Sequence, residues 1–317
     1  MANPVIVWRA ATARTGGTVM LQVAEDLFRE AGLDIASIEA EELNDGFDQS
    51  SVPVDMRPAF FERYAGSIVV GGHDNWISAI FGHPLVRTLF VRRDLREAAA
   101  SLRRLNGAEI GGLENLIKGW IEIHRLMHEL IPDHCLAVDY AEVLDIERMA
   151  RRIAAYFALE VGEDAIGRIA ATYDKAALAG SLARARQRIF HELTALGDTA
   201  SDEKVRNADV TAGEATARIR LPVDHLTPDC ARRIDADGWD RLSTLDFDLP
   251  ESGRISLEAS ADGRTLRIVD MKDAGVGDFN ADHVRSAETP PWETAFSDDE
   301  IDRINRLTAD FRRTFGY

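Results

Sequence analysis

The sequence predicts an α/β fold, in which a parallel central sheet is flanked by helices, with a P-loop-like strand–loop–helix near its start and a small inserted β-hairpin near its C-terminus. Three observations predict this fold. Apolar, strand-like runs alternate with helical patterns over residues 1–160, as in parallel sheets that are covered on both faces. The glycine-bearing turn "TARTGGT" (12–18) separates the first strand from the first helix. Asp262-Gly263 joins two alternating runs within 254–269, which is the pattern of a tight hairpin.

Each element follows from its own local pattern. The strands of the sheet are predicted at the apolar runs "PVIVW" (4–8), "GSIVVGG" (66–72), "VRTLFVRR" (86–93) and "HCLAVDY" (134–140). Helical spacing of apolar residues predicts helices at about 18–31, 94–105, 112–131, 141–158 and 162–196. The stretch 197–250 is polar and shows little periodicity. The final segment begins a helix at a capping box, with Ser297 as the N-cap and Glu300 three residues later.

Composition limits the classes of function. The 317 residues suffice for one large α/β domain or two small ones, and the formal net charge of -17 argues against general nucleic-acid binding or attachment to anionic membranes. Any anionic ligand must therefore be held by local arginine and backbone N–H groups. Cys135 and Cys230 form no metal or redox motif and are expected to be reduced thiols. With neither a signal peptide nor an apolar run of about 18 residues, we expect a cytoplasmic protein with no membrane span.

The loop after the first strand predicts an anion site. It lacks the lysine of the Walker pattern, and its only cation is Arg14. A helix N-terminus offers free N–H groups and a positive dipole end, which suit a phosphate or a sulfate. A second strand ends at Arg93, and Ser101 follows eight residues later, about two turns into the next helix. Two anion sites, one at each strand end, suit a nucleotide that is phosphorylated at two places.

Three motifs carry a resemblance to a known family. "TARTGGT" resembles the 5′-phosphosulfate loop of cytosolic-type and bacterial sulfotransferases, enzymes that use 3′-phosphoadenosine 5′-phosphosulfate (PAPS). "RDLREAAAS" (93–101) resembles their 3′-phosphate motif, and "VDYAEVL" (138–144) with its following helix resembles a third shared stretch. The likeness covers residues 4–160, and the tail from "DHVRS" to the terminal Gly-Tyr is similar to that of many bacterial members.

The resemblance implies roles for individual residues. Arg14 would stabilise the charge that develops on the leaving phosphate, and His73, in "VVGGHDN", would be the general base that takes the proton of the acceptor hydroxyl. Arg285 is a candidate for a further cation of the 3′-phosphate site, as is Lys272, and the choice between them stays open. The implied donor-binding residues are Arg14, Thr15, Gly16, Gly17, Thr18, Arg93, Ser101 and Arg285.

The resemblance also implies the organisation of the chain. It predicts one sulfotransferase-like domain over 1–317, with a nucleotide-binding core at 1–160 and a C-terminal segment, 271–317, that closes the core. The region 161–270 would be variable and could form the acceptor side, and the hairpin at 254–269 is expected there or at a contact in a possible homodimer. The implied acceptor is a hydroxyl-bearing small molecule, lipid or glycan. PAPS would serve as co-substrate, and no metal is required.

Departures from the family pattern keep two alternatives open. Gly17 replaces a usual hydroxyl residue, and Gly71 stands where a lysine often precedes the catalytic histidine. A P-loop kinase is one alternative, although the Walker lysine is missing. A non-catalytic protein that binds a 3′,5′-bisphosphonucleotide is the other. His124 and His128 form an H-x-x-x-H pattern, but Arg125 stands where a zinc protease would have glutamate, so we interpret this helix as an ordinary amphipathic one.

Overall fold

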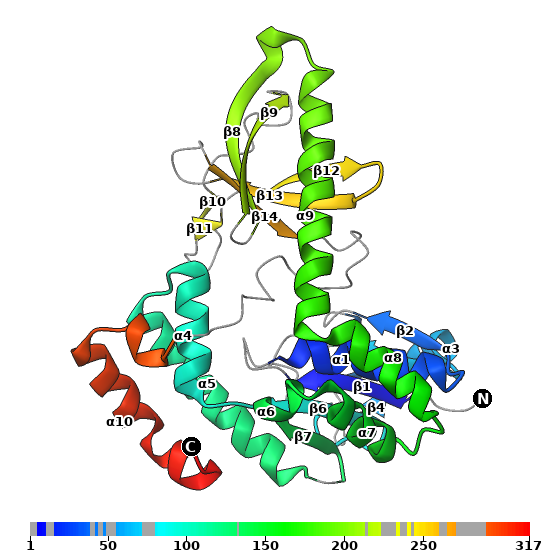
Figure 1. Cartoon of the computed structure of the whole chain (residues 1–317). Coiled ribbons are helices and arrows are strands. Elements are labelled where there is room, and N and C mark those ends of the chain that lie inside the picture. Colours follow the sequence, from blue (N-terminus) through cyan, green and yellow to red (C-terminus); the bar gives the residue numbers. More distant parts are fainter. Residues whose placement is uncertain are drawn as a thin grey trace. The chain divides into compact units, whose positions relative to one another are not determined.

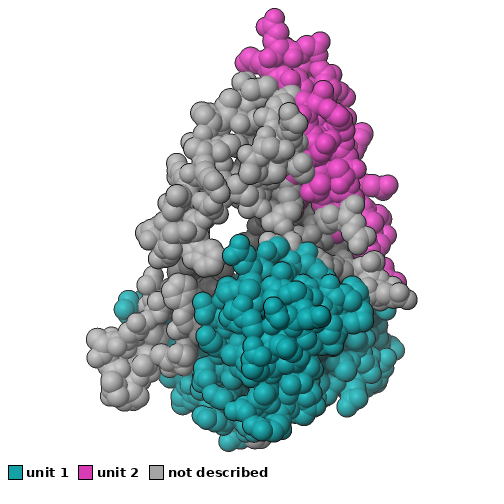
Figure 2. Space-filling view, turned by 90° about the vertical axis from the view of Figure 1, so that its left-hand side faces the viewer, with its two compact units in different colours: residues 1–174, 290–317 teal, residues 175–289 magenta. Residues whose placement is uncertain are grey.

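The computed structural model describes most of the chain. The described residues are 5–10, 16–38, 42–43, 47–48, 55–71, 80–131, 133–212, 215–222, 233–234, 240–241, 244–259, 265–270 and 290–317. They divide into two compact units, which are coloured separately in Figure 2. Unit 1 comprises Met1–Asp174 and Pro290–Tyr317, and unit 2 is Lys175–Thr289. These limits differ from the boundaries at 160 and 270 that the sequence suggested, and the assignment of one sulfotransferase-like domain stays a prediction.

Unit 1 contains the predicted parallel sheet. Its five strands lie in the order β2-β5-β1-β6-β7, and every neighbouring pair is parallel. The strands are β1 (Val5–Ala10), β2 (Ile35–Ile38), β5 (Ile68–Gly71), β6 (Val86–Arg92) and β7 (Cys135–Asp139). The sequence predicted four of them and missed β2. This strand is short and half-exposed at the edge of the sheet, so it carries no apolar run to mark it.

Helices cover both faces of this sheet (Figure 1). One face packs on α1 (Gly17–Glu30), α7 (Ile146–Tyr156) and α8 (Glu163–Tyr173), in a core that includes Val7, Leu89 and Val138. On the opposite face, α3 (Pro58–Arg63) packs near Ile6 and Trp8, and α5 (Ile110–Glu129) packs near Phe90. Strand residues one position apart thus enter different cores, as the pleat of a strand requires. The α/β prediction is confirmed.

The last helix completes an outer core in unit 1. Helix α10 (Asp298–Phe315) lies against α5 and α4 (Leu95–Asn106), and its Ile304 and Phe311 are buried among residues of both. The predicted capping box is confirmed, because the Ser297 backbone N–H donates to Glu300 Oε2 at 2.9 Å. Trp292 and Phe296, which precede the helix, pack on the same core.

Unit 2 combines a long helix with a second sheet. Helix α9 (Lys175–Asp198) contacts a five-stranded sheet of order β12-β13-β14-β8-β9, in which β14 and β8 are parallel and the other pairs are antiparallel. The strands are β8 (Val205–Ala212), β9 (Ala215–Pro222), β12 (Thr244–Leu249), β13 (Gly253–Ala259) and β14 (Thr265–Asp270).

The predicted hairpin is confirmed as β13 and β14, but it is part of this larger sheet. Leu257 pairs with Ile268, and both are buried, as the alternation predicted. The sequence predicted no strand within the polar stretch 197–250, where β8, β9 and β12 lie. Their buried face includes small residues, such as Ala208 and Ala212. Because alanine is only weakly apolar, the alternation of buried and exposed positions is faint in the sequence.

Short elements complete the description. They are the strand pairs β3 (Phe47–Asp48) with β4 (Asp55–Met56) and β10 (Arg233–Ile234) with β11 (Asp240–Arg241), helix α6 (Tyr140–Val143), and the 3₁₀ turns η2 (Asp202–Lys204) and η4 (Trp292–Ala295). Among the described helices, none is both long enough and apolar enough to cross a membrane.

Candidate functional site

The candidate site lies at the carboxyl ends of β1 and β6, which are neighbours in the sheet of unit 1. The chain leaves β1 into α1, which packs on one face. It leaves β6 through α4 into α5, which packs on the other face. The connections after two adjacent strands thus run to opposite faces. Such a reversal opens a crevice at the strand ends, and open α/β sheets bind their ligands there.

The first arm of the site is the turn from β1 into α1. Gly16 is the N-cap of α1 and has φ 85°, in the left-handed region that glycine adopts without strain. A Cβ atom at this position would lie 3.0 Å from Val143 Cγ1 and 3.4 Å from Tyr140 Cε2. No acidic residue stands in the first turn of α1. The backbone N–H groups of Gly17 and Thr18 therefore lie at the positive end of the α1 dipole. No acidic side chain of the first turn neutralises this positive end.

A buried arginine lies beneath this arm, and the sequence interpretation missed it. Arg9, in β1, is only 4% exposed, and its Nη1 donates to Thr18 Oγ1 at 2.7 Å. The only visible signal is a charged residue inside the otherwise apolar strand "VIVWRA". A buried guanidinium needs acceptors for its N–H donors, and the Thr18 hydroxyl is one of them.

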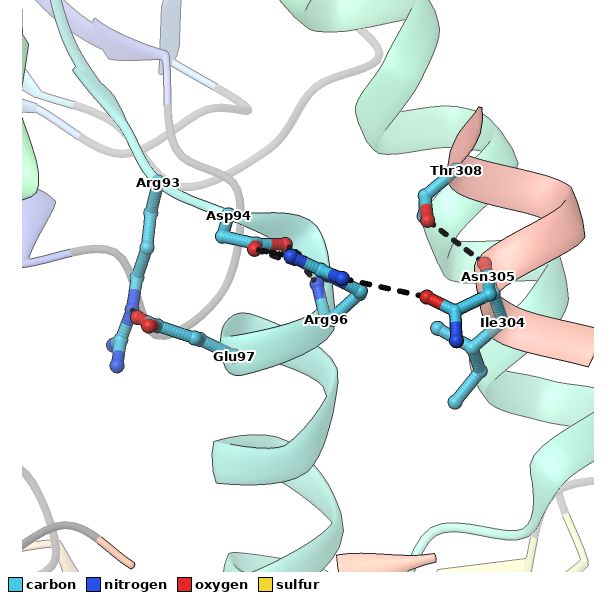
Figure 3. A network of polar contacts seen from close by, with 7 residues as sticks. All are labelled: Arg93, Asp94, Arg96, Glu97, Ile304, Asn305 and Thr308. Carbon is cyan, nitrogen blue, oxygen red and sulfur yellow. Dashed lines mark hydrogen bonds and ion pairs between the residues drawn. The ribbon is translucent and has the colours of Figure 1, made fainter. Parts of the chain in front are cut away.

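The second arm is the residue that follows β6. Arg93 is 7% exposed, and its Nε donates to Glu97 Oε2 at 3.2 Å. Glu97 stands one turn into α4, and its carboxylate is about half exposed. Figure 3 shows the Glu97 side chain meeting the Arg93 guanidinium from the helix. Arg93 is therefore a fixed cation whose carboxylate partner remains in contact with solvent.

Tyr140 connects the two arms. The Cζ atom of Arg93 lies 3.9 Å from the centroid of the Tyr140 ring, which is close cation–π stacking. The same ring packs against Gly16 of the first arm. Tyr140 begins α6 directly after β7, so three neighbouring strand ends contribute to one cluster. The structure thus brings Gly16 and Arg93 to the same ring, and the binding of an anion by either of them stays a prediction.

The neighbouring arginines are held by acidic groups. Arg92 forms an ion pair with Asp139 at 3.0 Å, across the paired ends of β6 and β7. Arg96 is paired with Asp94, and its Nη1 also donates to Asn305 Oδ1 of α10 at 3.3 Å (Figure 3). The Arg92 ion pair joins the ends of β6 and β7, and the Arg96 contact with Asn305 joins α4 to α10.

The C-terminal Tyr317 lies near the same edge. Burial, followed by the negative charge of Asp139, raises the pKa of Tyr317 to about 12. Its ring stacks on Phe311 with a centroid separation of 5.7 Å. The Tyr317 side chain thus adds a neutral phenol to this part of the sheet edge at physiological pH.

The other predicted site residues divide into two groups. Ser101 lies on α4, four residues after Glu97, and is partly buried. This spacing places Glu97 and Ser101 on one face of the helix, and the joint action of Arg93 and Ser101 on one anion stays a prediction. Outside the described residues lie Arg14, Thr15, His73, Arg285 and the alternative cation Lys272.

The glycine at position 71 has a steric cause. A Cβ atom there would lie 2.6 Å from the backbone oxygen of Ile38 and 2.6 Å from Trp8 Cζ3. Both distances are far below a van der Waals contact. A lysine therefore does not fit at position 71, because the neighbouring strand and the Trp8 ring fill the space.

The H-x-x-x-H pattern lies on an amphipathic helix, as the sequence interpretation held, with His124 buried and His128 exposed. His124 is 1% exposed and packs edge-on against Phe90 and Phe311, with ring centroids 4.7 and 4.9 Å away. Its Nδ1–H donates to the Trp120 carbonyl at 2.8 Å, and burial lowers its pKa to about 4. In the described part of the chain, no group of three or more His, Cys, Asp or Glu side chains is arranged to hold a metal ion.

Comparisons with known proteins give distant structural likenesses. No protein-family model matches the chain, and no curated protein matches it in sequence. A solved structure of retinol dehydratase, in complex with androsterone and the inactive cofactor PAP, is similar with a TM-score of 0.44 and 11% identity. The match covers 97% of this chain and 80% of that one. A gluconokinase from Sinorhizobium meliloti 1021 gives a TM-score of 0.24 and 14% identity, over 54% of this chain and 97% of that one.

Proposed function

We propose that the protein is a PAPS-dependent sulfotransferase that transfers a sulfuryl group to a hydroxyl of a small molecule, a lipid or a glycan. One observation carries this proposal. Gly16, at the N-terminus of α1, and Arg93, after β6, lie against the same Tyr140 ring. Two anion-binding arms at adjacent strand ends suit a nucleotide that bears phosphoryl groups on both its 5′ and 3′ positions.

In this proposal the first arm holds the 5′-phosphosulfate. The N–H groups of Gly16 to Thr18 and the Thr18 hydroxyl face the anion, together with Arg14 and Thr15. These donors are fixed before the reaction, so they stabilise charge that spreads over the transferring group without reorganising. The second arm, Arg93 with Ser101, and with Arg285 or Lys272, holds the 3′-phosphate.

The proposed transfer is an in-line displacement at sulfur. The acceptor oxygen forms a bond to sulfur while the bond between sulfur and the bridging phosphate oxygen breaks. His73 takes the proton of the acceptor hydroxyl, and Arg14 stabilises the leaving phosphate, so that adenosine 3′,5′-bisphosphate (PAP) remains. A neutral histidine with an ordinary pKa is a suitable base near neutral pH.

Ligand-dependent melting tests the donor assignment. A ligand that binds only the folded state raises the melting temperature. We expect PAP to raise it more than adenosine 5′-phosphate, which differs only by lacking the 3′-phosphate, and more than ATP. Arg93→Ala removes a charge-assisted contact and is expected to weaken the binding of PAP by about ten- to a hundredfold. The binding of adenosine 5′-phosphate should be almost unaffected by this substitution.

Arg92→Ala is the matched control, because Arg92 is the adjacent arginine and pairs with Asp139. It should leave the preference for PAP intact. Equal stabilisation of the wild-type chain by PAP and adenosine 5′-phosphate would refute the donor assignment. A stronger response to ATP than to PAP would favour the kinase alternative.

Turnover separates an enzyme from a binding protein. Release of PAP from PAPS in the presence of generic phenols should be measurable. His73→Ala should lower this rate about a hundredfold or more at nearly constant PAP affinity, because general-base catalysis typically contributes that much. Tight binding of PAP without any turnover would instead support the non-catalytic alternative.

A further inference from the structure

The geometry points to Arg9 as a second, buried cation of the anion site at the N-terminus of α1, where it orients Thr18 and adds positive charge beneath the 5′ end of the bound nucleotide. This inference rests on the proposed function only for the identity of the nucleotide. It concerns a residue of β1 that lies outside the loop to which the sequence motif assigned the site.

The burial of Arg9 is the first step. A guanidinium stays protonated at every physiological pH, and taking such a charge out of water costs several kcal/mol unless opposite charge or strong acceptors surround it. Arg9 is 96% buried, in a strand whose other buried residues are apolar or aromatic. A guanidinium is therefore kept at such a position where its donors act on fixed acceptors, and Thr18 Oγ1 is one of these acceptors.

The direction of the guanidinium is the second step. Its Nη1 donates to Thr18 Oγ1 at 2.7 Å, so the head group reaches the first turn of α1. The Gly17 and Thr18 N–H groups start that turn. A guanidinium has several N–H donors and serves several acceptors at once. A further contact within the protein therefore leaves it able to act on an anion at the helix end.

The hydrogen bond also fixes the Thr18 hydroxyl. A threonine hydroxyl has one proton and can accept as well as donate. Because Oγ1 accepts from Arg9, its proton must point away from Arg9 and is available to an acceptor at the end of the helix. The positive charge next to it strengthens this donor. Arg9 thus acts on the ligand both by its charge and through Thr18.

Binding of two nucleotides that differ at one end tests this role. PAP has a phosphate at the 5′ position, and adenosine 3′-phosphate lacks it. Calorimetry should show that Arg9→Met weakens the binding of PAP by about ten- to a hundredfold, as expected for loss of a charge-assisted contact. The affinity for adenosine 3′-phosphate should change by less than about twofold, because the phosphate of this nucleotide would lie in the other arm. Arg9→Lys, which keeps the charge, should retain part of the PAP affinity.

Two further variants make the test specific. Thr18→Val keeps the shape of the side chain and removes the hydroxyl, so it should weaken PAP and spare adenosine 3′-phosphate. Thr88→Val is the matched control, because Thr88 is a fully buried threonine of the adjacent β6. The Thr88 hydroxyl has no hydrogen-bond partner among the described residues. Thr88→Val should leave both affinities unchanged.

Each result decides the matter. If Arg9→Met melts normally and binds PAP as tightly as the wild-type chain, Arg9 is purely structural and the inference fails. If Arg9→Met does not fold, Thr18→Val decides, and equal losses for both nucleotides overturn the inference. If the wild-type chain binds ATP instead of PAP and Arg9→Met weakens ATP, the proposed function fails while the role of Arg9 stands. If the wild-type chain binds none of the three nucleotides, both fail.

Discussion

At Gly16, two constraints meet in one residue. Its backbone is left-handed, with φ 85°, and an added Cβ would lie 3.0 Å from Val143 Cγ1. Gly32 also has a positive φ, of 72°, but an added Cβ there meets nothing within 4 Å. Gly32→Ala should therefore lower the free energy of unfolding by about 1 kcal/mol, the usual cost of this backbone region.

Gly16→Ala should lower it by at least twice as much, because the contact with Val143 adds to the backbone strain. Urea unfolding of the two variants compares these costs. Equal effects of the two substitutions would show that the packing of Gly16 on Val143 is not tight.

His124 predicts a dependence of stability on pH. Its folded-state pKa of about 4 lies below the ordinary value of 6.5, so the unfolded chain binds this proton more readily than the native one. Stability should fall as the pH drops from about 6.5 to about 4, by an amount of the order of 3 kcal/mol. His124→Leu cannot titrate and should flatten this part of the profile.

His128→Leu is the control for this experiment, because His128 lies one turn further along the same helix and is exposed. Its profile between pH 7 and pH 4.5 should follow that of the wild-type chain. The measurement is urea unfolding at a series of pH values. An unchanged slope in His124→Leu would show that other groups cause the acid sensitivity.

The sequence located some site residues and not others for a physical reason. Gly16 and Arg93 stand in local patterns, a turn and a strand end, and such patterns are visible in a single sequence. The position of Tyr140 between them depends on the order of the strands in the sheet. The reach of Arg9 to Thr18 depends on a side-chain direction that no spacing encodes. The chemical roles of all these residues stay predictions.

Among the elements, the parallel sheet was easier to predict than the second one. Strands such as β6 are buried on both faces and read as continuous apolar runs. In β8 and β9 only one face is buried, and charged residues such as Asp209 and Arg218 alternate with small apolar ones. That mixture lowers the mean apolarity, so the sequence pattern predicted no strands there.

Helix α9 approaches the second sheet very closely at one residue. A Cβ atom at Gly197 would lie 1.7 Å from the backbone oxygen of Arg220 in β9. Gly180, in the same helix, would place its Cβ at an ordinary 3.4 Å from Arg184 Nη1. Gly197→Ala should destabilise unit 2 by about 2 kcal/mol or more, because the strand must move away.

Gly180→Ala is the matched control and should stabilise the helix by about 0.5 to 1 kcal/mol, since alanine is the better helix former. Thermal unfolding followed by circular dichroism distinguishes the two directions. A neutral Gly197→Ala would show that α9 and β9 are further apart than described.

For the whole molecule, the division into two units predicts two unfolding transitions. Each unit has its own sheet and its own buried residues. Calorimetry of the full chain should resolve two unfolding steps. PAP should raise the midpoint temperature of only the step that belongs to unit 1, because the proposed donor site lies there. Ile255→Ala, in the core of unit 2, should lower only the other step, by the cost typical of a core cavity. A single transition that both changes shift together would contradict independent units.

The interrupted course of unit 1 has a consequence for biosynthesis. Its outer core, around Leu113 and Trp120 of α5, is completed by Ile304 and Phe311 of α10, and the whole of unit 2 is translated between these helices. On the ribosome, the apolar face of α4 and α5 therefore remains uncovered by α10 while α9 and the second sheet are synthesised. During that interval the nascent chain exposes a surface that chaperones recognise. A synonymous slow-codon stretch just before residue 290 would lengthen this exposure and should lower the soluble yield without altering the finished protein.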